Sequence, residues 1–202
     1  MYKLRHHTPD EDAALVASWR SGETASFESL VRKHQKRMFN IAFRITGDYD
    51  DSCELVQDAF VAACRGIDSF RGAVRFSTWL ASITVSKSRD SLQRATGVRK
   101  MATHFSHATP APNIGASAHE WLVAASSALE QLERAAIADK LQGCIRTLSV
   151  EFRELIVLRD IEGFTYNEIC AILKTREGTV KSRLYRAREL VKDCLKKAVG
   201  EL

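Results

Sequence analysis

Hydrophobic residues recur at helical spacing along most of the chain. Between residues 27 and 45 they stand three or four positions apart, as on the buried face of an amphipathic helix, and Gly47-Asp48 then interrupts the pattern. Two more stripes follow before residue 95, and only three prolines occur in 202 residues, so the pattern predicts an all-α protein. The three stripes are Phe27, Leu30, Val31, His34, Met38, Ile41, Ala42 and Ile45; Leu55, Val56, Ala59, Phe60 and Ala63; and Phe76, Trp79, Leu80 and Ile83.

A further helix is expected near the N-terminus. Thr8-Pro9-Asp10-Glu11 offers a capping threonine, a proline at the first helical position and a glutamate able to bond back to the cap. This helix is expected to run to about Arg20. Its candidates for burial are Ala13, Leu15, Val16 and Trp19.

The composition changes between residues 96 and 119, where Thr, Ser, Ala, Gly and two prolines replace the helical pattern. Such a stretch is typical of an extended or mobile linker. Helical periodicity resumes near Glu120. The sequence therefore predicts two small helical domains, residues 1–95 and 125–202, joined by a flexible linker at residues 96–124.

The C-terminal block has the pattern of a helix-turn-helix. A helix with Phe152, Leu155, Ile156 and Leu158 is expected to end at Glu162-Gly163. A capping box at 165–168 opens a short second helix, and residues 174–176 form a tight turn before a long third helix. The stripe expected to bury this last helix is Val180, Leu184, Ala187, Val191 and Leu195.

Charge is concentrated on this last helix. The whole chain has a formal net charge of +5, and residues 176–197 alone contain eight Lys or Arg against three Asp or Glu. A basic helix could simply be a solvated surface. Following a capped helix and a tight turn, it instead favours phosphate neutralisation in a DNA-binding unit.

Several other classes of protein are disfavoured. No window approaches the roughly 18 apolar residues of a membrane-spanning helix, and the polar, then acidic start is no signal peptide. The five cysteines, scattered without metal-binding spacing, are expected to be reduced and mostly buried in a cytoplasmic protein. Asp90 has no neighbouring acid or histidine, and no glycine-rich phosphate loop occurs, so we expect no catalytic site, metal or cofactor.

Specific motifs then resemble those of a known family. Residues 163–169 (GFTYNEI) and 177–188 (EGTVKSRLYRAR) closely resemble the sigma4 domain of ECF (extracytoplasmic function, group 4) sigma factors of bacterial RNA polymerase. Residues 50–60 (DDSCELVQDAF), 70–80 (FRGAVRFSTWL) and 89–94 (RDSLQR) resemble their sigma2 domain, in the same order. The resemblance implies a sigma2 helical bundle and a sigma4 helix-turn-helix. It also implies promoter-specific initiation of transcription without enzymatic activity.

The resemblance places two DNA contacts. The long basic helix would enter the major groove of the −35 element, and the segment from Phe70 to Arg94 would bind and help open the −10 element. The −35 base-edge candidates share the face opposite the buried stripe, and flanking residues are candidates for phosphate. These sets are Lys181, Ser182, Tyr185 and Arg186 for bases; Thr179, Arg183 and Arg188 for phosphates; and Arg71, Arg75, Trp79, Ser86, Arg89 and Arg94 for the −10 element.

Tyr185 and Trp79 each have a second interpretation. Tyr185 could simply cover its own helix, and the spacing of Trp79 to Ile83 favours a core position over stacking on a base.

The resemblance also implies protein partners. Asp48, Asp50, Asp51, Glu54 and Asp58 would repel DNA, so this acidic helix is expected to meet a basic protein surface. In the family this surface is the clamp helices of the largest polymerase subunit, here met by Leu55, Gln57 and Asp58, while sigma4 meets the flap of the second-largest subunit. An anti-sigma factor is expected to cover both domains. A solvated helix N-terminus with favourable acids was the alternative for residues 48–51.

The sequence departs from the family at two positions. Ser86 stands where the family usually has Asn, which leaves the −10 preference open. Lys174 stands where a Gly is usual, and we expect it to adopt an ordinary turn conformation. Two rival classes are possible on these patterns. A ligand-sensing helix-turn-helix regulator leaves the acidic helix unexplained, and an enzyme with an accessory DNA-binding domain, such as a nuclease, needs convergent carboxylates that the sequence does not offer.

Overall fold

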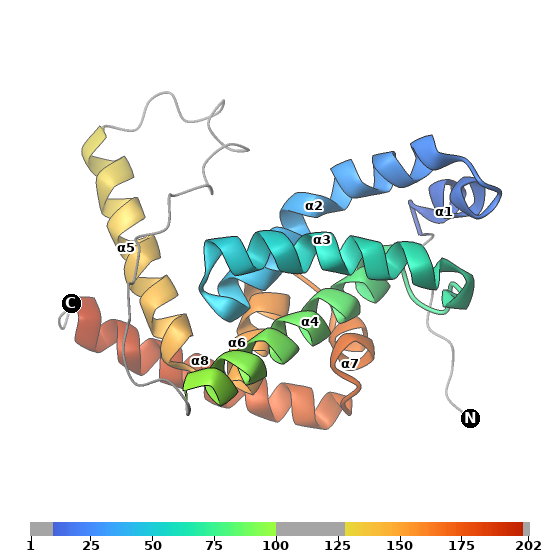
Figure 1. Ribbon diagram of the computed structural model, residues 1–202. Coiled ribbons are helices and arrows are strands. Elements are labelled where there is room, and N and C mark those ends of the chain that lie inside the picture. The colour runs from blue at the N-terminus through green and yellow to red at the C-terminus, as the bar shows by residue number, and fades with distance from the viewer. Residues whose placement is uncertain (1–9, 100–127, 200–202) are drawn as a thin grey trace.

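The computed structural model describes residues 10–99 and 128–199, and no strand occurs among them (Figure 1). The all-α prediction is confirmed. The elements are α1 (Ala13–Arg20), α2 (Thr24–Thr46), α3 (Tyr49–Gly66), η1 (Ile67–Ser69), α4 (Phe76–Arg99), α5 (Ala128–Thr147), α6 (Val150–Ile156), η2 (Val157–Ile161), α7 (Tyr166–Leu173) and α8 (Glu177–Val199).

Helices α2, α3 and α4 pack on one another and form the core of the N-terminal half, residues 10–99. Their buried faces are the three predicted hydrophobic stripes, although four members are only partly buried, namely Phe27, Val31, Trp79 and Ile83. Gly47 ends α2 with φ 82°, and the Asp48 side chain accepts a hydrogen bond from the Asp51 N–H to begin α3. The predicted break at Gly47-Asp48 is therefore confirmed.

The predicted start of the first helix is wrong. Helix α1 begins at Ala13, which is exposed, and Thr8 and Pro9 lie outside the described residues. Asp10 accepts a hydrogen bond of 2.8 Å from the Phe76 N–H at the start of α4, and buried Asp12 lies 2.7 Å from the His34 ring nitrogen. These acids serve contacts with α4 and α2, which sequence spacing does not reveal.

The C-terminal half, residues 128–199, contains the predicted helix-turn-helix. The Thr165 hydroxyl accepts from the Glu168 N–H, and the Glu168 carboxylate accepts from the Thr165 N–H, so the capping box of α7 is confirmed. Residues 174–176 form the turn, and the stripe of α8 is buried from Val180 to Val191. Helix α4 continues to Arg99, past the predicted start of the linker at 96, and the renewed helix at Glu120 lies outside the described residues.

Lys174 does not adopt an ordinary turn conformation. Its φ of 50° and ψ of 45° are left-handed, and it is the only non-glycine residue with positive φ among the described residues. Its N–H donates to the Cys170 carbonyl and ends α7. The turn therefore requires a conformation that costs a residue with a Cβ about 1 kcal/mol.

We expect Lys174→Gly to raise the free energy of unfolding by about 0.5–1 kcal/mol, because glycine adopts this conformation without a steric penalty. Urea denaturation followed by circular dichroism measures the change. Lys192→Gly, in the regular interior of α8, is the control and should lower stability by about 1 kcal/mol. A loss of stability in Lys174→Gly would contradict the assignment of strain to this residue.

The two halves pack against each other. Helix α7 packs against α4, and α2 contacts α5, α6 and η2 (Figure 1). Arg153 of α6 donates a hydrogen bond of 2.5 Å to the Ile45 carbonyl of α2, and Arg44 donates one of 2.6 Å to the Gln142 side chain of α5. The two helical halves are therefore in direct contact, and we call this the closed arrangement.

The expectation of reduced thiols is wrong for one pair of cysteines. Cys144 of α5 and Cys194 of α8 form a disulfide, with 5.7 Å between their Cα atoms. Of the other three, Cys64 is exposed and Cys53 and Cys170 are half-buried. A separation of 50 residues gives no pairing signal in the sequence, whereas the packing of α5 on α8 brings the two side chains together.

Candidate nucleic-acid interface

The outer face of α8 carries the predicted base-edge residues. Lys181, Ser182, Tyr185 and Arg186 are all exposed, and Tyr185 is 68% exposed. The opposite side, with Val180, Leu184 and Ala187, packs into the C-terminal half. Burial of one side leaves the other side free to meet a DNA groove.

Ion pairs hold the flanking arginines of α8. Arg183 lies 2.9 Å from the Glu151 carboxylate of α6, and Arg188 binds both oxygens of Asp160 at 2.9 and 2.5 Å. Both arginines are partly or fully solvent-accessible, and Thr179 is half-buried in the first turn of α8. These pairs orient the guanidinium groups beside the exposed face.

The predicted −10 residues do not share one environment. Arg71, Ser86 and Arg94 are exposed, while Arg75 and Arg89 bind carboxylates of the C-terminal half. Ser86 and Arg89 line an open cavity whose other wall includes Leu173 and Lys174 of α7 and the turn. Part of the predicted −10 surface of α4 is therefore covered by the C-terminal half.

Trp79 belongs to an aromatic cluster. Its ring lies 5.0 Å from that of Phe70 and 5.8 Å from that of Phe76, measured between centroids. It is half-buried beside Gly66, where an added Cβ would lie 3.6 Å from the indole. This packing supports the core interpretation of Trp79 over stacking on a base.

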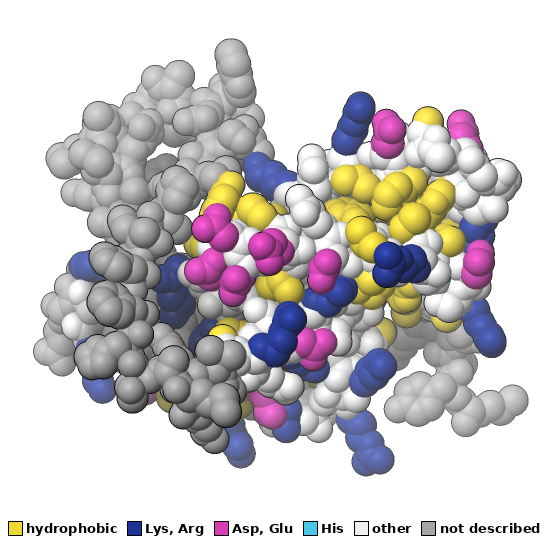
Figure 2. Space-filling model, in the orientation of Figure 1, with side chains coloured by type: hydrophobic (Ala, Val, Ile, Leu, Met, Phe, Trp, Pro, Cys, Tyr) yellow, Lys and Arg dark blue, Asp and Glu magenta, His cyan; other side chains and the backbone are white. Residues whose placement is uncertain are grey.

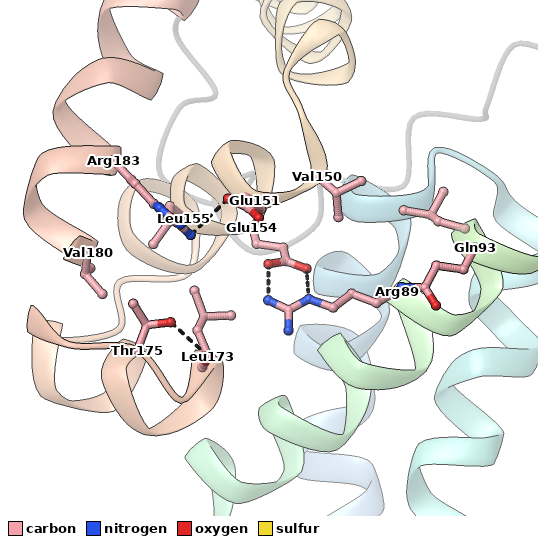
Figure 3. A pocket seen from close by; sticks show the side chains of 11 residues that line it. Arg89, Gln93, Val150, Glu151, Glu154, Leu155, Leu173, Thr175, Val180 and Arg183 are labelled. Carbon is pink, nitrogen blue, oxygen red and sulfur yellow. Dashed lines mark hydrogen bonds and ion pairs between the residues drawn. The ribbon is translucent and has the colours of Figure 1, made fainter. Parts of the chain in front are cut away.

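Arg89 and Glu154 form a buried ion pair between the halves. Two guanidinium nitrogens of Arg89 donate to the two Glu154 oxygens at 2.5 Å each (Figure 3). The Glu154 side chain is 0% exposed, whereas that of Arg89 is 38% exposed. The pair borders a cavity of about 490 Å³ between α4 and helices α6, α7 and α8. The sequence predicts a DNA contact for Arg89 and contains no local signal for its pairing with Glu154.

Two further arginines of the N-terminal half bind glutamates of the C-terminal half. Arg37 lies 3.2 Å from the Glu162 carboxylate and over the Phe164 ring, 4.0 Å from its centroid. Arg75 lies 3.9 Å from the Glu168 carboxylate, which also accepts from the Thr78 hydroxyl. We call these two pairs and Arg89–Glu154 the arginine–glutamate seam.

Burial and pairing act oppositely on the seam carboxylates. Burial raises the pKa of Glu154, and the hydrogen bonds and charge of Arg89 offset this only in part. Burial also raises the pKa of Glu162, against the charge of Arg37. For Glu168, burial raises the pKa, but hydrogen bonds from the Thr165 N–H and hydroxyl bring it below its ordinary value.

The raised pKa of Glu154 and the lowered pKa of Glu168 predict opposite pH dependences of stability. A raised pKa contributes stability that is present below the ordinary carboxyl pKa and is lost as pH rises through the raised value. Between about pH 4 and pH 7, the free energy of unfolding of the wild type should therefore fall relative to that of Glu154→Gln. Over the same range it should rise relative to that of Glu168→Gln. Urea denaturation across this range measures both slopes. A gain relative to Glu154→Gln would mean that pairing with Arg89 outweighs burial.

The acidic face of α3 is exposed. Asp48, Asp50, Asp51, Glu54 and Asp58 are all exposed and gather over the N-terminal part of α3 (Figure 2). Gln57 is exposed beside them, and Lys87 of α4 lies 3.3 Å from the Asp58 carboxylate.

Leu55 cannot contact a partner from this position, because its side chain is only 5% exposed and belongs to the core. Its assignment to a binding surface is corrected. Its place in the hydrophobic stripe with Val56 and Ala59 was the signal that could have excluded it.

Family models match both halves of the chain. Sigma-70 region 2 matches residues 30–97, and Sigma-70 region 4 matches residues 138–191, which together are more than half of the chain. The ECF RNA polymerase sigma-E factor of Escherichia coli K12 is 32% identical over 89% of this chain and 92% of its own length. The chain belongs to the ECF sigma factors.

Other relatives and solved structures agree with this assignment. The RNA polymerase sigma-H factor of Pseudomonas aeruginosa is 29% identical over 96% of this chain and 98% of its own length. The structure of CnrH in complex with the cytosolic domain of CnrY matches with a TM-score of 0.66 and 27% identity, over 93% of this chain and 99% of that chain. The sigma factor RpoE of Bartonella quintana, in complex with NepR, shares the fold at a TM-score of 0.63 and 24% identity, over 84% of this chain and 96% of that chain.

The two matched regions contain the surfaces described above. The acidic face of α3 and the −10 candidates lie in region 2, and the exposed face of α8 lies in region 4. Membership of this family argues against both rival classes, the ligand-sensing regulator and the nuclease. Within the described residues, no helix is long and apolar enough to cross a membrane.

Proposed function

We propose that this sigma factor recognises the −35 element with α8. The observation that carries the proposal is the exposed face of Lys181, Ser182, Tyr185 and Arg186 opposite a fully packed stripe. Arginine and lysine suit the guanine O6 and N7 acceptors of the major groove. Thr179, Arg183 and Arg188 contact phosphates on either side and fix the register of the helix.

Region 2 binds the −10 element with α4 and the loop before it. Arg71, Ser86 and Arg94 are accessible for this task, and Arg75 and Arg89 become accessible when the arginine–glutamate seam opens. Cations near an exposed strand suit the binding of melted DNA. Trp79 supports the loop from within the aromatic cluster and is not a base contact.

Gln57 and Asp58 on the acidic face of α3 bind the clamp helices of core polymerase, and region 4 binds the flap of the second-largest subunit. The exposed carboxylates of α3 suit a basic protein surface and disfavour DNA. The protein acts in the cytoplasm, where polymerase and promoter are found.

The closed arrangement represents an inactive state. Elements named −35 and −10 are centred about 25 base pairs apart, which is about 85 Å of duplex. A compact chain of 202 residues is only about 45 Å across. Region 2 and region 4 must therefore separate before both elements can be held.

An anti-sigma factor stabilises the closed state. CnrH and the Bartonella RpoE were each solved with a second protein, CnrY and the anti-sigma factor NepR respectively. A partner of this kind, bound across both regions, would hold the arginine–glutamate seam shut.

Transcription in vitro with core polymerase free of other sigma factors tests the proposal. Adding this protein is expected to give promoter-specific transcripts from a pool of genomic promoters. The absence of any specific transcript would overturn it, and operator binding without polymerase would favour a helix-turn-helix regulator instead.

We expect Arg186→Ala to weaken promoter binding by about 1–3 kcal/mol, with the loss confined to one base pair of the −35 element, because a bidentate base contact is removed. Titration of labelled promoter variants with polymerase holoenzyme measures the change. Lys192→Ala, an exposed cation farther along α8, is the matched control. An equal loss across all −35 variants would make Arg186 a phosphate contact.

A further inference from the structure

One pair of cysteine side chains links α5 to the C-terminal end of α8. Cys144 lies in the last turn of α5 and is 2% exposed, and Cys194 lies near the end of α8 and is partly exposed. The two form a disulfide, and the other three cysteines of the chain remain free thiols.

Few side chains at this end of α8 are buried in the part of the chain that the structure describes. Beyond Val191, only Cys194 and Leu195 are partly buried, and the other side chains described there are exposed, namely Lys192, Asp193, Lys196, Lys197 and Ala198. The disulfide therefore adds a covalent link between the last turns of α8 and α5, which also pack on each other.

The bond also encloses the whole DNA-reading unit. A separation of 50 residues spans α6, η2, α7 and most of α8, including the exposed face of Lys181 and Arg186. Closing a loop of this length restricts the unfolded chain and stabilises the folded unit. The oxidation state of these two sulfur atoms thus contributes to the stability of the enclosed segment.

We propose that Cys144 and Cys194 form a reversible redox modification site with peroxide as the oxidant. In the cytoplasm proposed above, disulfides are usually transient and redox-sensing rather than structural. The inference depends on that location, but it requires neither promoter binding nor polymerase.

The partly exposed Cys194 reacts first. Its thiolate attacks one peroxide oxygen, the O–O bond breaks, and the sulfur becomes a sulfenic acid while the other oxygen leaves as water. The Cys144 thiolate then attacks this sulfur, the S–S bond forms, and the hydroxyl leaves as a second water. Two thiols are oxidised by two electrons and one peroxide is reduced. Two molecules of reduced glutathione reverse the step: the first attacks the Cys194 sulfur and releases the Cys144 thiolate, and the second attacks the glutathione sulfur of the mixed disulfide, which releases Cys194 and leaves oxidised glutathione.

The full-length protein is reduced, freed of reductant, treated with hydrogen peroxide and then with reduced glutathione. Peptide mapping without reductant should find one cross-link, between Cys144 and Cys194, lighter than the two thiol peptides by two hydrogens. The melting temperature of region 4 should rise by about 10–20 °C on oxidation and return with glutathione.

Two variants separate this site from the other thiols. Cys194→Ser should lose the cross-link and the rise in melting temperature, while Cys64→Ser, at the exposed thiol of α3, should keep both. The proposal is overturned if peroxide gives no Cys144–Cys194 cross-link, or if Cys194→Ser keeps the temperature rise. A cross-link that glutathione does not reverse would also overturn it, because the bond would then be a permanent structural one. Loss of transcription in the reduced protein would bear on the proposed function and not on this site.

Discussion

We expect Arg89→Ala to separate region 2 from region 4. The change leaves the fully buried Glu154 carboxylate without its bidentate partner. At a pH where the Glu154 carboxyl stays ionised, an unpaired buried charge costs about 3–5 kcal/mol, and this cost is relieved when α6 moves away from α4 and water reaches the carboxylate. A penalty of this size shifts a two-state equilibrium by more than about 100-fold.

Small-angle X-ray scattering measures the opening. The radius of gyration should rise from about 17 Å, the value for a compact chain of this length, by several ångströms. Helix content by circular dichroism should stay constant, because the helices of each region remain packed.

Two variants serve as controls for Arg89→Ala. Glu154→Gln should have a smaller effect, since the Arg89 side chain is already 38% exposed and can be hydrated in place. Asp160→Asn breaks a similar bidentate pair with Arg188, but within region 4, and should leave the radius unchanged. An unchanged radius in Arg89→Ala would show that this pair does not hold the closed state, and a larger effect of Glu154→Gln would show that the unpaired buried charge is not what opens it.

Substitutions of two adjacent residues of α8 should affect different properties, the stability of the fold in one case and recognition of DNA in the other. Leu184 is 1% exposed and packs into the core, whereas Tyr185 is 68% exposed on the opposite face. We expect Leu184→Ala to lower the free energy of unfolding by about 2–5 kcal/mol through lost burial and a residual cavity. Tyr185→Ala should change it by no more than about 0.5 kcal/mol.

Urea denaturation measures the first property, and promoter titration with holoenzyme measures the second. Tyr185→Ala is expected to weaken −35 binding while it retains the wild-type denaturation midpoint. A loss of stability in Tyr185→Ala equal to that in Leu184→Ala would support the alternative that this ring only covers its own helix.

Local features of this fold follow from the sequence, because their causes lie within a few residues. The period of the α2 stripe, the glycine at position 47 and the Thr165–Glu168 box each act over one or two helical turns. The exposed face of α8 follows in the same way from the stripe that starts at Val180. These patterns specify the helices, the break and the helix-turn-helix directly.

Features that depend on tertiary packing could not be predicted. Nothing in the sequence around Asp10 indicates that it bonds to the first turn of α4, and nothing near Arg89 indicates Glu154, 65 residues away. The Cys144–Cys194 bond is of the same kind. Lys174 differs from these cases. The sequence shows a lysine where the family usually has glycine, but the packing of α7 and α8 sets the left-handed conformation of this residue.

The Arg89–Glu154 pair has a consequence for how the closed chain meets DNA. A carboxylate and a phosphate each present two oxygens that a guanidinium can bind at once. Glu154 therefore imitates a nucleic-acid backbone, and it occupies the guanidinium that the proposed −10 contact would use. If Arg89 binds the −10 element as proposed, DNA would have to compete with the Glu154 carboxylate for this side chain while the two halves are closed.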